Sequence, residues 1–197
     1  MSEKTIINKG EIEVAFRGKI CKVIYQDIEI IDGNKVSRFK SEKVIRSPGT
    51  RLIIVNNKNQ ILLTKEYRHE IEDWDYRLPG GKVFDKLEDF ESCSEDKILE
   101  SAKIAAKKEL EQETGLTSNL INFYYLSKMA ASTIFFDLYY FEVNNPIALN
   151  VGQELELGEH ISIDWYTFDK VKEMCLNRKI SEDRSVGVLF RYILNNY

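Results

Sequence analysis

The sequence predicts an α/β fold in which a small antiparallel strand region precedes the main domain. Runs of β-branched and aromatic residues over 11–46 indicate strands joined by tight turns. Continuous apolar runs between 51 and 66 indicate buried strands of a second sheet. Apolar residues recur with the 3.6-residue period of a helix over 99–114, and two further helices are predicted after residue 168.

Length and composition agree with one globular domain and a small accessory unit. The 197 residues are 43% hydrophobic and 30% charged, and a net charge of −4 gives no basic surface of the kind that nucleic-acid binding requires. We therefore expect a small-molecule partner and no nucleic acid. The start of the chain lacks a signal-peptide pattern, and no run approaches the roughly 18 apolar residues of a membrane span. This predicts a cytoplasmic protein without a membrane partner.

The N-terminal region, residues 1–47, contains a strong hairpin signal. Asp32-Gly33-Asn34 separates two strand-like runs, and an Asp-Gly pair favours tight hairpin turns. So small a sheet buries little apolar surface by itself, so it must pack on the rest of the chain or on a second copy. Ser47-Pro48-Gly49 marks the predicted boundary with a main domain over 48–197.

A glycine pair precedes the predicted helix. Gly80 and Gly81 follow Pro79. Because glycine tolerates conformations that other residues avoid, the pair allows a sharp turn that exposes backbone carbonyls and amides. Such a turn suits a metal and phosphate site better than it suits a plain connector.

The helix over 99–114 carries two glutamates on one face. Glu109 and Glu113 are four residues apart, so their Cβ atoms lie about 5–6 Å from each other on adjacent turns. A divalent cation relieves the repulsion between them, and Mg²⁺ binds carboxylate and carbonyl oxygens together with substrate phosphates. A merely solvated polar face is the alternative. On the buried face we expect an apolar stripe, made of Leu99, Ala102, Ala105, Ala106 and Leu110.

These residues resemble the Nudix box, whose pattern is Gly, five residues, Glu, seven residues, then Arg-Glu-aliphatic-x-Glu-Glu-x-Gly-aliphatic. Gly81 matches the first Gly, and the seven-residue spacer between Glu100 and Lys108 is intact. The remaining matches are Glu109, Leu110, Glu113, Gly115 and Leu116. Gly115 also stands where a left-handed helix cap is expected. The resemblance implies a Nudix α/β/α sandwich with a mixed sheet.

Three positions depart from the Nudix pattern. Lys108 replaces the Arg, Gln112 replaces the first Glu of the pair, and the five-residue spacer has grown to the 18 residues 82–99. By the resemblance, Lys108 and Glu100 form a structural ion pair. The acidic insertion at 82–99 either covers the site and restricts substrate size or is a tolerated surface insertion.

Other segments resemble the subgroup that hydrolyses ADP-ribose and nucleotide sugars. Glu66-Tyr67-Arg68 is similar to its Gln-Tyr-Arg segment, in which the Arg helps to hold substrate; a solvated Arg68 is the alternative. Arg77 stands where the subgroup has a Glu, and we take Arg77 as a second substrate-binding candidate. Glu159 matches the loop Glu that completes the metal and water site, with Glu156 and Glu154 as alternatives.

The resemblance implies Mg²⁺-dependent hydrolysis of the pyrophosphate bond in a nucleoside diphosphate linked to another moiety, with Mn²⁺ as a possible substitute. The metal ligands are then Gly80, Glu109, Glu113 and Glu159, and Glu159 orients or deprotonates the attacking water. A nucleoside triphosphate pyrophosphohydrolase is the alternative enzyme. A non-catalytic nucleotide sensor is the alternative outside enzymes, and Gln112 favours it. In this subgroup the N-terminal strands take part in a homodimer, which we also expect here.

Overall fold

The computed structural model describes residues 5–128, 133–156 and 158–196. By its contacts the chain divides into two compact units. The first comprises Met1–Ser47, Phe84–Cys93 and Lys128–Asp137, and the second comprises Pro48–Val83, Ser94–Ser127 and Leu138–Tyr197. No helix in the described ranges is both long and apolar enough to cross a membrane.

The first unit is built on three long antiparallel strands. Strands β1 (Ile6–Arg17), β2 (Cys21–Asp32) and β3 (Lys35–Arg46) pair in chain order, and the short β9 (Ile134–Phe135) joins β3 in parallel. Gly33 has a positive φ of 57° in the turn between β2 and β3, where Asp32 pairs with Lys35. This confirms the N-terminal antiparallel strand region and its hairpin.

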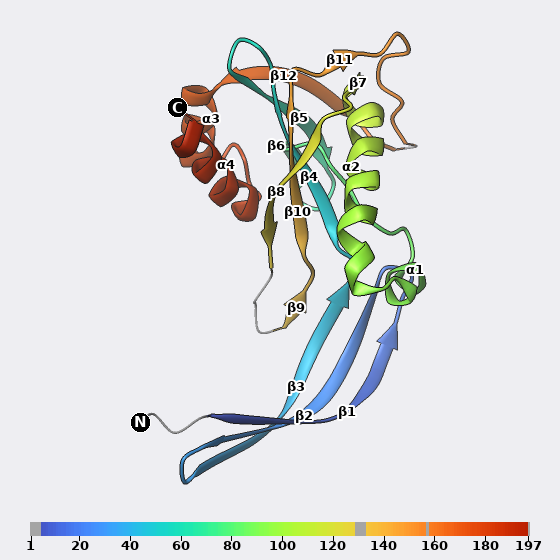
Figure 1. Cartoon of the computed structure of the whole chain (residues 1–197), viewed down its shortest axis with the longest axis vertical. Coiled ribbons are helices and arrows are strands. Elements are labelled where there is room, and N and C mark those ends of the chain that lie inside the picture. Colours follow the sequence, from blue (N-terminus) through green and yellow to red (C-terminus); the bar gives the residue numbers. More distant parts are fainter. Residues whose placement is uncertain (1–4, 129–132, 157, 197) are drawn as a thin grey trace. The chain divides into compact units, whose positions relative to one another are not determined.

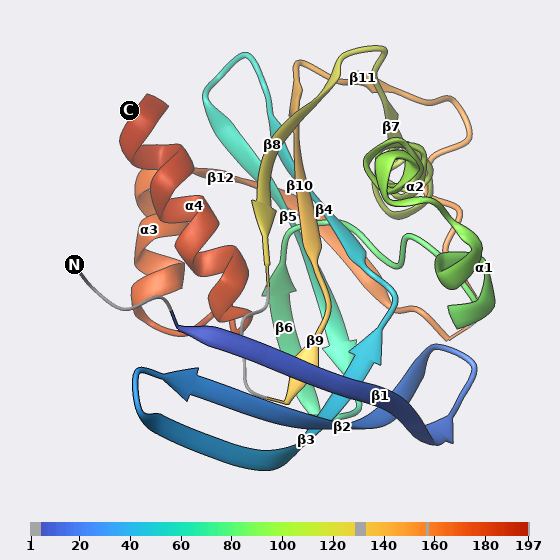
Figure 2. The ribbon, with the colours of Figure 1, turned by 60° about the horizontal axis from the view of Figure 1, so that its bottom comes forward.

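The middle of the acidic insertion belongs to this first unit. It forms the short helix α1 (Leu87–Ser92), which lies beside the loop between β1 and β2 (Figure 2). The backbone N–H of Leu87 donates to the carbonyl of Lys19 at 2.7 Å, and the Leu87 side chain is buried. Glu91 forms ion pairs with Arg17 and Lys22. The insertion is therefore anchored on the strand region.

The second unit is an α/β/α sandwich. Its sheet has the order β12 (Ile161–Thr167), β5 (Gln60–Arg68), β4 (Gly49–Val55), β10 (Leu138–Asn144) and β8 (Ile121–Ser127). Strands β4 and β10 are parallel and the other pairs antiparallel, so the sheet is mixed. Figure 1 shows α2 (Ile98–Thr114) on one face and both α3 (Phe168–Leu176) and α4 (Asp183–Asn196) on the other. The predicted sandwich is thus confirmed.

Three short elements complete this unit. A 3₁₀ turn, Glu95–Lys97, leads into α2, and β7 (Leu116–Thr117) pairs with β11 (Ile147–Ala148). Helix α2 ends at Gly115, whose φ of 64° and whose N–H bond to the Glu111 carbonyl form the expected left-handed cap.

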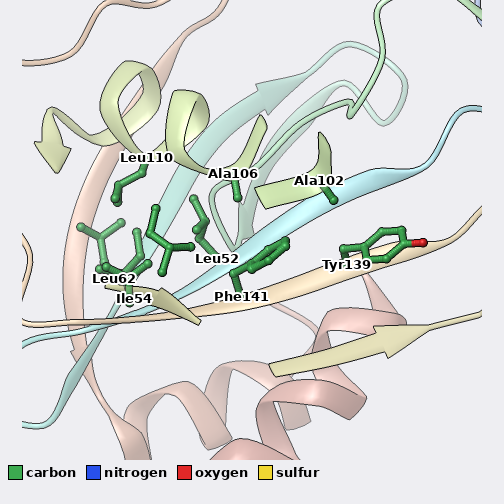
Figure 3. Close-up of a cluster of buried hydrophobic side chains, with 10 residues drawn as sticks. Leu52, Ile54, Leu62, Ala102, Ala106, Leu110, Tyr139 and Phe141 are labelled. Carbon is green, nitrogen blue, oxygen red and sulfur yellow. The ribbon is translucent and has the colours of Figure 1, made fainter. Parts of the chain in front are cut away.

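The main core lies between α2 and the sheet. Ala102, Ala106 and Leu110 of α2 are fully buried there, whereas Leu99 of the predicted stripe is 42% exposed. The sheet contributes side chains from four strands, and those labelled in Figure 3 are Leu52, Ile54, Leu62, Tyr139 and Phe141. This packing fixes how α2 lies over β4 and β10.

The sheet divides where the site is built. Strands β4 and β5 pair at Val55 and Ile61, and further along β5 pairs instead with β6 (Asp73–Arg77). The Pro79–Gly81 turn then follows β6 and is hydrogen-bonded to β4. The N–H of Leu52 donates to the Pro79 carbonyl and the N–H of Thr50 to the Gly81 carbonyl, both at 2.9 Å. Segment 79–81 is therefore held on β4 by two backbone hydrogen bonds.

Candidate metal and substrate site

Glu113 of α2 is held against the glycine turn. Its side chain lies in a buried position, 8% exposed, and its Oε2 accepts a hydrogen bond of 2.7 Å from the N–H of Gly80. Gly80 has a φ of 144°, and a Cβ there would lie 2.2 Å from the Thr50 carbonyl oxygen. Glycine is therefore required at position 80, both by the backbone conformation and by the close approach of β4.

Glu109 lies against the second glycine of the turn. A Cβ on Gly81 would be 2.0 Å from Oε1 of Glu109. Both carboxylates of the helix pair therefore meet the Gly80–Gly81 backbone, as the four-residue spacing predicts.

Burial and neighbouring negative charges make the two glutamates unusually hard to ionise. Burial raises the pKa of Glu109 to about 7, and the charge of Glu159 adds to the effect. Burial also raises the pKa of Glu113 to about 8, with the charge of Glu109 as the next cause. A buried and a half-buried carboxylate with oxygens directed at one turn fit a divalent cation, because its charge offsets both the desolvation and the repulsion.

The loop glutamates lie close enough to act on this pair. The charge of Glu159 raises the pKa of both helix glutamates, and the charge of Glu156 raises the pKa of Glu109. Oε2 of Glu159 accepts a hydrogen bond from the Glu156 N–H at 2.9 Å. Within the described ranges no group of three or more His, Cys, Asp or Glu side chains is arranged to hold a metal ion. The structure thus brings Glu109 and Glu113 together and leaves Glu159 bonded within its own loop.

The acidic loop is fastened to the C-terminal end of α2. The N–H of Glu154 donates to the Gln112 carbonyl at 2.9 Å, and the side-chain amide of Gln153 donates to the Glu113 carbonyl. These bonds satisfy carbonyls that a helix end leaves without partners. Glu154 therefore contacts the helix end through its backbone N–H. Gln153 also lies beside the site, and no sequence motif points to it.

Lys108 does not pair with Glu100. The Lys108 Nζ lies 4.0 Å from Oε1 of Glu156, and both side chains are more than half exposed. Glu100 is exposed eight residues earlier, about 12 Å away along the helix axis. The predicted ion pair between Lys108 and Glu100 is wrong because that separation exceeds the reach of neighbouring turns. Gln112 is half-buried in the next turn of the helix.

Arg68 and Arg77, the predicted substrate arginines, stand at the C-terminal ends of β5 and β6, where Arg68 pairs with Asp73 and Arg77 pairs with Thr64. Nη2 of Arg68 lies 2.9 Å from Glu66, and Nε of Arg77 lies 2.5 Å from Asp75. Burial raises the pKa of Glu66, both arginines lower it, and Glu159 raises it again. These groups therefore share one electrostatic environment. The Nε of Arg68 is buried, and it has no hydrogen-bond partner among the residues that the structure describes.

A buried ion pair that the motifs do not include lies next to the turn. Arg51 of β4 donates from Nε and Nη2 to the carboxylate of Glu182 at 3.0 and 2.9 Å. Its charge lowers the pKa of both Glu109 and Glu113. A charged residue inside the apolar run RLIIV was the available signal, because such residues are rarely buried unless they are paired.

The chain is similar to known proteins over most of its length. The model of the NUDIX domain matches residues 46–185. The chain is 25% identical over 187 residues to the methanol dehydrogenase activator of Bacillus methanolicus, covering 93% of this chain and 89% of that protein. It is 24% identical over 189 residues to the ADP-ribose pyrophosphatase of Bacillus subtilis strain 168, covering 94% and 89%.

A solved structure is similar in fold. The crystal structure of an ADP compounds hydrolase superposes with a TM-score of 0.68 at 18% identity, covering 99% of this chain and 94% of that one. Nudix hydrolases generally use divalent metal ions, which agrees with the carboxylate pair at the turn. The chain therefore belongs to the Nudix family, as a hydrolase that resembles the ADP-ribose pyrophosphatase subgroup.

Proposed function

We propose that this enzyme hydrolyses the pyrophosphate bond of a nucleoside diphosphate linked to another moiety, with ADP-ribose or a nucleotide sugar as the first candidates. The products are a nucleoside monophosphate and a phosphorylated second product. The observation that carries the proposal is the carboxylate pair of half-buried Glu109 and buried Glu113, held against the Gly80–Gly81 turn. The similarity to the ADP-ribose pyrophosphatase of Bacillus subtilis supports the substrate class.

We further propose Mg²⁺ as the ion, with Mn²⁺ as a substitute. Glu109, Glu113 and the Gly80 carbonyl offer hard oxygen donors, which Mg²⁺ prefers, and a bound cation would offset the burial that raises the pKa of both glutamates. A bound divalent ion supplies Lewis-acid screening of the pyrophosphate charge and makes a water molecule easier to deprotonate.

The remaining catalytic and substrate-binding roles fall to side chains of the chain itself. Glu159 accepts a proton from the attacking water, whose oxygen forms a bond to one phosphorus as the bridging P–O bond breaks. The arginines at positions 68 and 77 bind the phosphate oxygens. Arg68 is the better placed, because its buried Nε is a donor without a partner in the described part of the chain. Arg77 binds substrate through donors other than the Nε that contacts Asp75.

A substrate screen tests the proposal. ADP-ribose, nucleotide sugars and nucleoside triphosphates are incubated separately with Mg²⁺ or Mn²⁺, and the products are separated by chromatography. We expect a nucleoside monophosphate from the diphosphate-linked substrates. Release of pyrophosphate from triphosphates alone would establish the alternative enzyme. A protein that binds these nucleotides and cleaves none of them would contradict both.

We also propose that the N-terminal strand region forms a homodimer. Strand β1 is exposed along its whole length, and its large apolar side chains, such as Ile12 and Phe16, are each about half exposed. Apolar surface of this extent marks interaction sites in soluble proteins. A second copy of the chain is the proposed partner.

A further inference from the structure

The connection between α3 and α4 contacts both strands that flank the glycine turn. On the β6 side, Ser181 donates to Asp75 twice, from its hydroxyl at 2.7 Å and from its N–H at 3.2 Å. On the β4 side, the adjacent Glu182 accepts two hydrogen bonds from Arg51. The N–H of Tyr76 also donates to the Lys179 carbonyl at 3.3 Å. Segment 179–182 thus bridges the opening between β4 and β6.

The charged side chains in these contacts are largely buried, and their burial costs solvation free energy. Asp75 is 2% exposed, and the side chains of Arg51 and Glu182 are 11% and 17% exposed. Replacing a buried ion pair by apolar residues of similar volume is often neutral or stabilising, because the desolvation penalty disappears with the charges. Stability alone therefore gives little reason to keep the Arg51–Glu182 pair.

Segment 179–182 is linked to the glycine turn both through β4 and through β6. Nη1 of Arg51 donates to the carbonyl of Thr50, and the N–H of Thr50 donates to the carbonyl of Gly81. Gly80 packs directly on Thr50 and Arg51, with room for no Cβ. Asp75 also holds Arg77, which lies two residues before Pro79.

We propose that segment 179–182, here called the strap, is a positioning device that fixes the spacing of β4 and β6 and thereby holds the Gly80–Gly81 turn against Glu109 and Glu113. Arg51, Ser181 and Glu182 are its positioning residues. Their hydrogen bonds are with β4 and β6, so they position the turn, while the charge of Arg51 also lowers the pKa of Glu109 and Glu113. The role assigned to the turn, to hold a divalent ion with these glutamates, rests on the proposed function.

The decisive variant replaces the ion pair by apolar residues, as Arg51→Met with Glu182→Leu. We expect it to fold with an unchanged or higher Tm, because no buried charge is left unpaired. We also expect it to bind Mn²⁺ about 10-fold more weakly, which is the scale for residues that orient metal ligands. The kcat falls by a similar factor, and the KM for the nucleotide changes less.

Ser181 supplies a milder variant with a conservative rescue. Ser181→Ala removes the hydroxyl bond to Asp75 and keeps the backbone bond, so a smaller loss of Mn²⁺ affinity is expected. Ser181→Thr keeps the hydroxyl at an exposed position and should restore affinity. The matched control is Tyr192→Phe, which breaks the partly buried hydrogen bond from the Tyr192 hydroxyl to Glu142 between α4 and the sheet. The control should lower the Tm and leave Mn²⁺ binding unchanged.

Two measurements distinguish a failure of the strap proposal from a failure of the proposed function. Bound Mn²⁺ is counted by electron paramagnetic resonance, and exchange of the Gly80 amide, which is bonded to Glu113, is followed in the metal-free protein. We expect faster Gly80 exchange in the double variant, whatever the protein hydrolyses. Unchanged exchange together with unchanged Mn²⁺ affinity would overturn the strap. Faster exchange in a protein whose wild type binds no Mn²⁺ would uphold the strap and refute the metal site.

Discussion

At the scale of single residues, Glu113 has the largest predicted effect on turnover. It is buried, bonded to Gly80 and repelled by Glu109. We expect Glu113→Gln to keep the fold and to reduce kcat to less than about a tenth, a rise in barrier above about 1.4 kcal/mol. Glu100→Gln, an exposed change on the same helix, is the control and should leave kcat unaltered. Retention of most activity by Glu113→Gln would remove Glu113 from the metal site.

The two glycines of the turn give opposite predictions. At Gly81 an added methyl meets the flexible end of Glu109, so Gly81→Ala should leave the Tm nearly unchanged and weaken Mn²⁺ binding by displacing that carboxylate. At Gly80 the methyl meets the backbone of β4 at a positive φ, so Gly80→Ala should lower the Tm strongly. Thermal unfolding and Mn²⁺ titration of both variants check this. A lower Tm for Gly81→Ala than for Gly80→Ala would contradict it.

Gln112 tests how much charge the site needs. It lies one residue before Glu113, and its neutral amide offers an oxygen to a cation without the charge of the usual Glu. We expect Gln112→Glu to lower the Mg²⁺ concentration for half-maximal rate, measured by titrating Mg²⁺ at saturating substrate. If neither rate nor metal dependence changes, Gln112 lies outside the reach of the metal.

At the scale of elements, local sequence patterns predict some features of the site, whereas features that depend on contacts between distant residues do not follow from these patterns. The turn at Pro79–Gly81, helix α2 and its Gly115 cap follow from glycine chemistry and from a period of 3.6 residues, and both signals are local. The strap depends on Ser181 meeting Asp75, 106 residues away in sequence. Helix α1 depends on Glu91 meeting Arg17, 74 residues away. Periodicity carries no information about such pairs.

The Arg51–Glu182 pair, which joins β4 to the strap, makes stability depend on pH. Burial alone raises the pKa of Glu182, but the charge and hydrogen bonds of Arg51 outweigh it and lower that pKa to about 2. Because the folded pKa is depressed, the stabilisation is complete above the unfolded value of 4.5 and is lost as the pH falls toward 2. Wild type should therefore lose more Tm between about pH 6 and pH 3 than Arg51→Met with Glu182→Leu. Equal losses would show that the pair has no such linkage.

At the scale of the whole molecule, the N-terminal strands predict the oligomeric state. Strands β1 to β3 leave many large apolar side chains exposed, among them Ile7, Ile12, Phe16, Val36 and Phe39. Because a second copy of the chain covers such surface without any other partner, we expect a dimer of about 46 kDa, twice the 23.0 kDa of one chain. Light scattering at micromolar concentration measures this mass.

Two charged substitutions locate the interface of that dimer. Phe16→Lys places a charge at a side chain of β1 that is 58% exposed, so it should yield a monomer without lowering the Tm of the second unit. Leu194→Lys makes the same kind of change at a 73% exposed position of α4 and should leave the dimer intact. Dissociation by Leu194→Lys alone would move the interface to the second unit. A wild-type mass near 23 kDa would show that the strands remain uncovered by a second copy.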